Sequence, residues 1–193
     1  MAATNVMANR KYFACNAPRR LSSTPYANSE NNMSTKRTLS HVDDAGRAKM
    51  VDVSDKVATV RSATAEAWVQ VGPEIARLLR RTGGVAKGNV LATAELAGVM
   101  AAKKTGEFIP MCHPLGLDHV EVHAALTGGK VRIVASARCE GKTGVEMEAM
   151  TAASVAALTV YDMVKSAGKG VEIGPIRLLE KTGGKSGTWQ RKK

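Results

Sequence analysis

The chain has 193 residues, of which 44% are hydrophobic and 4% aromatic, and a formal net charge of +11 at pH 7. This length suits one domain with a buried core, and the scarcity of aromatic rings argues against a platform on which single-stranded nucleic acid stacks. The excess of positive charge indicates an anionic partner, such as a phosphate-bearing ligand, a nucleic acid or an acidic surface, although solubility and a basic leader also explain part of it.

The three cysteines, Cys15, Cys112 and Cys139, lie far apart and form no CxxC pair. A disulfide framework or a structural zinc site is therefore not expected, and a reducing compartment fits this pattern. No apolar run approaches the roughly 20 residues that a membrane helix needs, so we expect a soluble protein.

Residues 1–35 differ in composition from the rest of the chain. They carry four basic residues against one acid and are rich in Asn, Ser and Ala. This composition is typical of an organellar transit peptide, and Arg-Arg-Leu-Ser-Ser at 19–23 resembles a matrix-protease site. We expect a disordered leader that directs the protein to the mitochondrial matrix. The alternative is an ordinary disordered tail on a cytoplasmic protein.

Residues 36–193 show hydrophobic patterning without an internal repeat or a second core, so we expect a single domain. Strands joined as hairpins, with a few helices between them, indicate an α+β fold in which helices pack on one face of an antiparallel sheet. In chain order, we expect strands at 50–53 and 57–71, helices at 73–82 and 89–104, a loop at 109–115, hairpin strands at 120–126 and 131–137, a helix within 141–170 and a strand at 171–179.

The stretch at 141–170 joins a Gly-Lys-Thr-Gly loop to a helix of mostly small residues, which lets another backbone approach closely. Ionisable side chains stand at both ends of this helix, with Glu146 and Glu148 at its start and Asp162 and Lys165 near its end. Glu148 and Asp162 are separated by about 21 Å along a helix, so one chain cannot bring both to one small substrate. Either the two ends serve separate tasks, or two copies of the chain share a site.

Two loops, at 141–143 and 184–186, partly match a phosphate-binding P-loop. The first glycine that the motif requires is replaced by Ser136 in one case and by Leu179 in the other, so a P-loop NTPase is not predicted. Backbone amides and lysines of such loops can still hold a phosphate. We expect the segment at 181–187 to be a mobile loop that carries two cations.

Cys112 and His113 lie in a proline-flanked loop, where they form a metal pair, supply a catalytic histidine or simply make loop hydrogen bonds. Adjacent residues rarely ligate one metal, and no second Cys/His cluster lies near in sequence, so no metal site is expected. Asp162 and Lys165 are three residues apart on one helical face. They form either a surface ion pair or a carboxylate whose proton affinity the ammonium group tunes for proton transfer.

Five segments together carry a resemblance to a known family: KMVDV at 49–53, KGNV at 87–90, IPMCHPL at 109–115, the whole stretch at 141–170 and GPIRLL at 174–179. They closely resemble the MoaC family, the cyclic pyranopterin monophosphate synthases of molybdenum cofactor biosynthesis. The resemblance covers about residues 38–188, so residues 36–193 are expected to be one MoaC-like catalytic domain.

The resemblance implies a ferredoxin-like fold in a hexamer built as a trimer of dimers, with active sites at subunit interfaces and no nucleic-acid or membrane partner. The implied reaction converts (8S)-3′,8-cyclo-7,8-dihydroguanosine 5′-triphosphate into cyclic pyranopterin monophosphate and diphosphate, the work of a phosphorus–oxygen lyase. No cofactor is expected, although a Mg²⁺ ion can accompany the substrate triphosphate.

The resemblance also implies roles for individual residues. Asp162 is the acid/base residue, and Lys87 and Lys165 are the essential lysines. Where the family often has a charged or imidazole-bearing pair before Lys87, this chain has Val85 and Ala86. The expected catalytic residues are Asp162, Lys165, Lys87 and His113. The expected substrate-binding residues are Met111, Cys112, His113, Glu146, Met147 and Glu148, with Arg61, Lys181 and Lys185 as candidates for the triphosphate.

The alternative function is a basic, non-catalytic nucleic-acid-binding protein, which the net charge suggests. Such a protein needs a basic stripe with base-reading or stacking residues, and Phe and Tyr are scarce in this chain. A nucleic-acid complex sensitive to salt, without product from the cyclic triphosphate, would favour this alternative.

Overall fold

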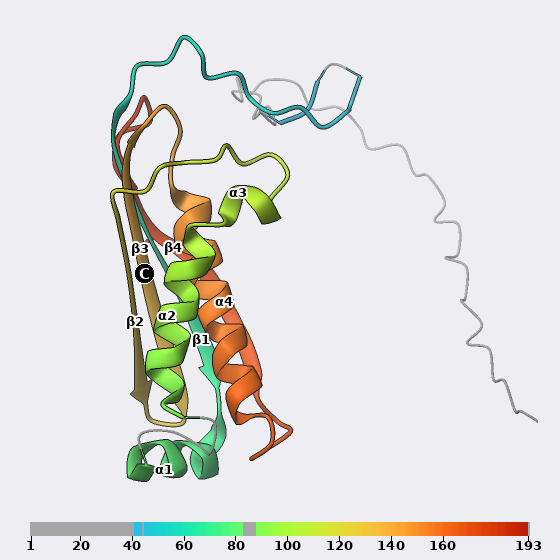
Figure 1. The fold of residues 1–193 in the computed structure, drawn as a ribbon, viewed down its shortest axis with the longest axis vertical. Coiled ribbons are helices and arrows are strands. Elements are labelled where there is room, and N and C mark those ends of the chain that lie inside the picture. The colour runs from blue at the N-terminus through green and yellow to red at the C-terminus, as the bar shows by residue number, and fades with distance from the viewer. Residues whose placement is uncertain (1–40, 44, 83–87, 193) are drawn as a thin grey trace, which may run out of the picture. The chain divides into compact units, whose positions relative to one another are not determined.

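The computed structural model describes residues 41–43, 45–82 and 88–192. The expected leader at 1–35 and Lys87 lie outside these ranges. The elements are β1 Thr59–Gln70, α1 Gly72–Thr82, α2 Val90–Ala102, α3 Thr105–Phe108, β2 His119–Thr127, β3 Lys130–Gly141, α4 Glu146–Val164, β4 Glu172–Thr182 and β5 Trp189–Gln190 (Figure 1).

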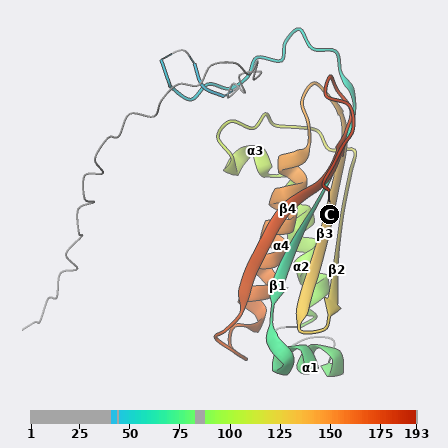
Figure 2. The same cartoon turned by 180° about the vertical axis from the view of Figure 1, so that it is seen from behind.

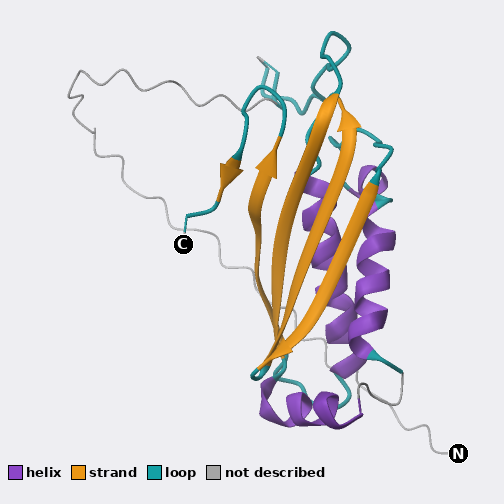
Figure 3. Cartoon of the chain, turned by 90° about the vertical axis from the view of Figure 1, so that its left-hand side faces the viewer, coloured by secondary structure: helices purple, strands orange, loops and turns teal. Residues whose placement is uncertain are grey.

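The strands form one antiparallel sheet in the order β2-β3-β1-β4-β5. The units β1-α2-β2 and β3-α4-β4 each cross over a third strand that lies between their own two, which is the ferredoxin-like arrangement. Both long helices lie on one side of the sheet, and no described helix covers its other, open face (Figures 2 and 3). The predicted α+β class and the single helix layer are therefore confirmed.

The core lies between the sheet and the two long helices, and small side chains build it. Alternation along β1 directs Ala63, Ala65, Ala67 and Val69 toward the helices, where they are buried. A Cβ atom on Gly98 of α2 would lie 2.9 Å from the carbonyl oxygen of Ala152 in α4. The small residues of α4 thus receive the backbone of α2, as their size predicts.

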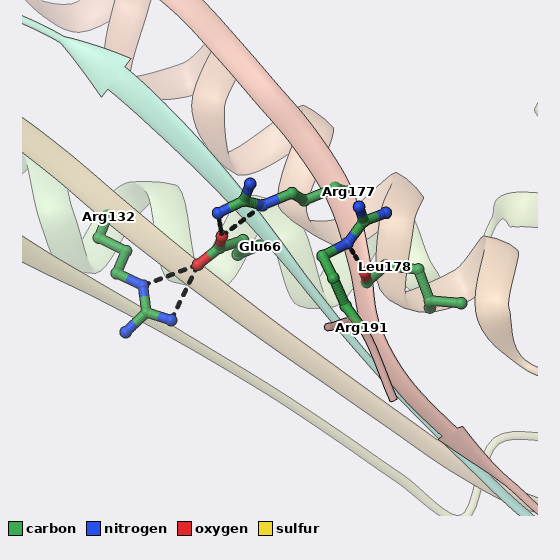
Figure 4. A network of polar contacts seen from close by, with 5 residues as sticks. All are labelled: Glu66, Arg132, Arg177, Leu178 and Arg191. Atoms are coloured by element: carbon green, nitrogen blue, oxygen red, sulfur yellow. Dashed lines mark hydrogen bonds and ion pairs between the residues drawn. The ribbon is translucent and has the colours of Figure 1, made fainter. Parts of the chain in front are cut away.

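The open face of the sheet contains an ionic network that the sequence analysis did not identify (Figure 4). Glu66 in β1 is 3% exposed and lies between Arg132 of β3 and Arg177 of β4, with nitrogen–oxygen distances of 2.8 and 2.7 Å. Arg132 also lies over the ring of Trp68, 5.7 Å from its centroid. Burial alone would raise the pKa of Glu66, but hydrogen bonds from the two arginines outweigh it and hold this pKa below its ordinary value.

Four sequence-based expectations need correction. The short strand β5 was not expected. The segment at 50–53 is not a strand, because Val51 and Val53 line a cavity instead of pairing with the sheet. The short helix α3 was not expected, and Lys181 belongs to β4 and not to the loop that follows it. Among the described residues, no helix has the length and apolarity to cross a membrane.

Candidate active site

A cavity of about 420 Å³ opens where the loop after α3 meets the start of α4. The loop contributes the segment that follows Pro110, and α4 contributes its first turn. The residues at 51–56 close a further side. The six side chains expected to bind substrate in this region all line the cavity: Met111, Cys112, His113, Glu146, Met147 and Glu148.

Glu148 is the buried acid of this cavity. Buried Val145 anchors the start of α4, so that the first helical turn directs Glu148 inward, where it is 3% exposed. Its Oε2 atom has no hydrogen-bond partner in the described part of the chain. Burial raises the pKa of Glu148 above its ordinary value, and the charge of Glu146 raises it further. A buried carboxyl group with a raised pKa is suited to proton transfer.

Cys112 and His113 are half-buried in the same loop, which begins with a turn closed by the Cys112 amide donating to the carbonyl oxygen of Ile109 at 3.0 Å. Burial raises the pKa of the Cys112 thiol, and the charge of Glu148 adds to this effect. Cys112 therefore remains a protonated thiol at neutral pH, and the nucleophilic form of the side chain is disfavoured. Among the described residues, no three His, Cys, Asp or Glu side chains are grouped so that they could hold a metal ion.

A second cavity, of about 400 Å³, adjoins the first and is lined by cations. Arg61 enters from β1, Lys181 from β4 and Lys185 from the loop after β4, so the structure brings the three expected triphosphate residues together. Lys56 and Lys142 also line this cavity. Lysines and arginines gathered in one concave site are suited to bind a multiply charged phosphate group.

The turn after β4 presses against Arg61 and orients its guanidinium group. Gly183 and Gly184 have φ angles of 88° and 70°, which favour glycine. A Cβ atom on Gly184 would lie 2.6 Å from the Cζ atom of Arg61, so the lack of a side chain allows this close approach. The Nε atom of Arg61 is buried without a hydrogen-bond partner among the described residues.

Asp162 and Lys165 lie elsewhere, at the far end of α4. Lys165 Nζ is 2.6 Å from Asp162 Oδ1, which confirms the predicted pair, and both side chains are more than half exposed. The hydrogen bond that Lys165 donates to the Asp162 carboxylate raises the pKa of Lys165. The pair lines neither cavity and is separated from Glu148 by about 21 Å of helix. Lys87, the remaining expected catalytic residue, is outside the described residues.

Sequence reasoning missed two of the five cations of the second cavity. Lys142 had a detectable signal, because it lies in the Gly-Lys-Thr-Gly loop that was considered able to hold a phosphate. Lys56 had none, since it follows a segment that was expected to be a strand. His41, which lines the first cavity, is likewise unmarked by any local pattern.

The scaffold and its paired cavities indicate a class of protein, an α+β enzyme for a phosphate-bearing small molecule. Comparison with known proteins makes this assignment specific. The model of the MoaC family matches residues 50–184. A cyclic pyranopterin monophosphate synthase of Methylobacterium sp. (strain 4-46) is 57% identical over 156 residues, which cover 79% of this chain and 96% of that relative. The chain belongs to the MoaC family.

Proposed function

We propose that this chain is a cyclic pyranopterin monophosphate synthase, a phosphorus–oxygen lyase that converts (8S)-3′,8-cyclo-7,8-dihydroguanosine 5′-triphosphate into cyclic pyranopterin monophosphate and diphosphate. One observation carries the proposal: a cavity containing His113 and Glu148 opens beside a cavity lined by five cations. The purine-derived part of the substrate fits the first cavity, and its triphosphate fits the second.

The cationic cavity matches the phosphoryl chemistry of this reaction. The cyclic phosphate forms when a sugar hydroxyl attacks the α-phosphorus and the bond to the leaving diphosphate breaks. Negative charge then develops on the phosphoryl and leaving oxygens, and positioned cations stabilise it. Arg61, Lys181 and Lys185 line this one cavity, which supports such a role for them.

The first cavity matches the proton transfers of the ring rearrangement. Protons must move on and off nitrogen and oxygen, which is work for a carboxyl group and an imidazole. Glu148, with its raised pKa, and His113 face the same cavity and would position or protonate the purine-derived part. Met111 and Met147 supply apolar contact for a planar ring.

We further propose a homo-oligomer, a hexamer built as a trimer of dimers, in which Asp162 and Lys165 of one copy complete the pocket of another. The separation of Glu148 and Asp162 along α4 supports this arrangement. So does the outer surface of the helix layer, where Leu96, Met100 and Leu158 are each more than half exposed. The one charged residue of α2, Glu95, is bound to the amide of Ala124 in β2 instead of lying outward. Uncharged helix surfaces of this kind commonly lie at interfaces.

No cofactor is part of the proposal, and Mg²⁺ enters only as a companion of the triphosphate. Placement in the mitochondrial matrix rests on the composition of residues 1–35 and on the Arg-Arg-Leu-Ser-Ser segment at 19–23. No observation on the described residues, and no comparison, favours the nucleic-acid-binding alternative.

The test is incubation of the purified chain with the cyclic dihydroguanosine triphosphate, with pyranopterin and diphosphate scored together. We expect both products from the wild type and a loss of at least about 100-fold in Asp162→Asn and Lys87→Ala, because general acid–base groups contribute that much or more. Glu121→Gln, on an exposed position of β2, is the control and should retain activity. Absence of product from the wild type would refute the proposed function.

A further inference from the structure

Glu146 stands at the boundary of the two cavities and lines both. It is the only carboxylate among the described residues that line the cationic cavity. Its Oε1 atom accepts a hydrogen bond from Lys181 Nζ at 2.7 Å, and both side chains are about 30% exposed. A cation placed for the substrate triphosphate is therefore already paired with an acid of the same chain.

The residue at 144 makes room for this arrangement. A Cβ atom on Gly144 would lie 2.7 Å from the Cδ atom of Glu146 and would collide with its Oε2 atom. The φ angle of Gly144 is outside the left-handed region, so the backbone itself does not require glycine here. The missing side chain instead allows the Glu146 carboxylate to fold back over the loop toward Lys181.

A carboxylate in this place conflicts with direct binding of a triphosphate. Phosphate oxygens and the Glu146 oxygens are both negatively charged, and both are attracted to the Lys181 ammonium group. The pair is only partly buried, so water can solvate the carboxylate once it leaves Lys181. A ligand that carries more negative charge can therefore displace the Glu146 carboxylate from Lys181.

Resting on the proposed function, we propose that Glu146 is a built-in competitor for the phosphate group and not a substrate-binding residue. Its carboxylate occupies the anion position of Lys181 in the empty site and is displaced when the triphosphate enters. When diphosphate is released, the carboxylate returns to Lys181. Glu146 thereby lowers the affinity of the site for short, weakly charged phosphates and assists product release.

The first experiment measures binding of inorganic triphosphate to the whole chain by titration calorimetry, without turnover. Glu146→Gln should bind about tenfold more tightly than the wild type, because the amide no longer competes for Lys181. Glu180→Gln is the matched control, since Glu180 neighbours Lys181 on β4 but accepts a hydrogen bond from Gln190 instead. It should bind within about twofold of the wild type. Unchanged or weaker binding in Glu146→Gln overturns the proposal.

A second set of variants separates this competition from a general loss of negative charge. In a Lys181→Met background, Glu146→Gln should give no further gain, because the contested cation is missing. Gly144→Ala should also tighten binding, because its methyl group moves the carboxylate away without removing it. A gain that persists without Lys181 overturns the proposal, and so does wild-type affinity in Gly144→Ala.

Turnover distinguishes this inference from the proposed function. Glu146→Gln should lower KM for the cyclic triphosphate and make diphosphate a stronger product inhibitor. If the wild type forms pyranopterin but Glu146→Gln binds triphosphate no more tightly, the proposed function stands and the competitor role of Glu146 is refuted. If the wild type forms no pyranopterin but Glu146→Gln binds inorganic triphosphate more tightly, the proposed function is refuted and the competitor role of Glu146 stands.

Discussion

Glu66 and Arg177 are 111 positions apart in the chain, and Arg177 Nη2 lies 2.7 Å from Glu66 Oε1 on the open face of the sheet. Arg132 binds the second oxygen of the same carboxylate. One buried acid therefore joins the central strand β1 to both of its neighbours (Figure 4). Charge-assisted hydrogen bonds of this kind are stronger than neutral ones.

Glu66→Gln should lower the free energy of unfolding by about 1 to 3 kcal/mol, since the arginines are 43% exposed and water can solvate them when the charge is lost. The folded-state pKa of Glu66 is below its unfolded value near 4.5. Its stabilisation is therefore complete above that value and is lost as the pH falls through the folded-state pKa. Urea denaturation at neutral and acid pH, with Glu121→Gln as control, should show the difference shrinking in acid. An equal difference at both pH values would contradict this account.

Glu148→Gln, unlike Glu66→Gln, should stabilise the fold at neutral and alkaline pH, and it should lower activity. The folded-state pKa of Glu148 is raised above the ordinary value of 4.5, so the wild type loses stability as the pH rises from that value through the folded-state pKa. The variant should consequently unfold at a higher temperature than the wild type at about pH 8 and at a similar temperature at about pH 4. Activity should fall at least about 100-fold. Thermal unfolding at both pH values, with exposed Glu107→Gln as control, checks this prediction.

Mixed oligomers of Glu148→Gln and Asp162→Asn should recover activity that neither variant has alone. If each site takes Glu148 from one copy and Asp162 from another, random pairing in two-fold symmetric dimers leaves roughly a quarter of the sites intact. Co-expression with two tags and purification through both isolates the mixed species. The control combines the two variants after separate purification, under conditions without subunit exchange. Inactive mixed oligomers, or a monomer at working concentrations, would exclude the shared site.

Gly98→Ala should destabilise the fold even though alanine is the better helix former by about 1 kcal/mol. The added Cβ atom would lie 2.9 Å from the Ala152 carbonyl oxygen and 3.1 Å from a methyl carbon of Val122, so α2 must move away from its neighbours. Overpacking of this kind costs about 1 to 3 kcal/mol, and we expect this cost to exceed the gain in helix propensity. Urea denaturation measures the change. Ala92→Gly, at an exposed position of α2, reports the propensity alone, and a net gain in stability from Gly98→Ala would contradict the packing account.

Much of the secondary structure follows from local properties of the chain. The hairpin of β2 and β3 follows from its alternation and the turn at Gly128. Helix α2 begins where Asn89 accepts hydrogen bonds from the amides of Leu91 and Ala92. These signals depend on residues only a few positions apart, so the sequence alone contains them.

Some features of the site likewise follow from local motifs, and others depend on the fold. Neighbouring residues such as Glu146 and Glu148 could be assigned to a pocket from their motif, and the length of their helix separated them from Asp162. The pairing of Glu146 with Lys181, across 35 positions, depends instead on which strand lies beside β1.

The sequence by itself determined the α+β class, the order of the long helices and strands, the family and six residues that line the first cavity, because each of these rests on local pattern or on contiguous motifs. Only the tertiary structure decided that Lys56 and Lys142 join Arg61 around one cavity, and that Glu66 is buried between two arginines. The physical reason is that such contacts join distant segments through the sheet order β2-β3-β1-β4, which no local pattern specifies.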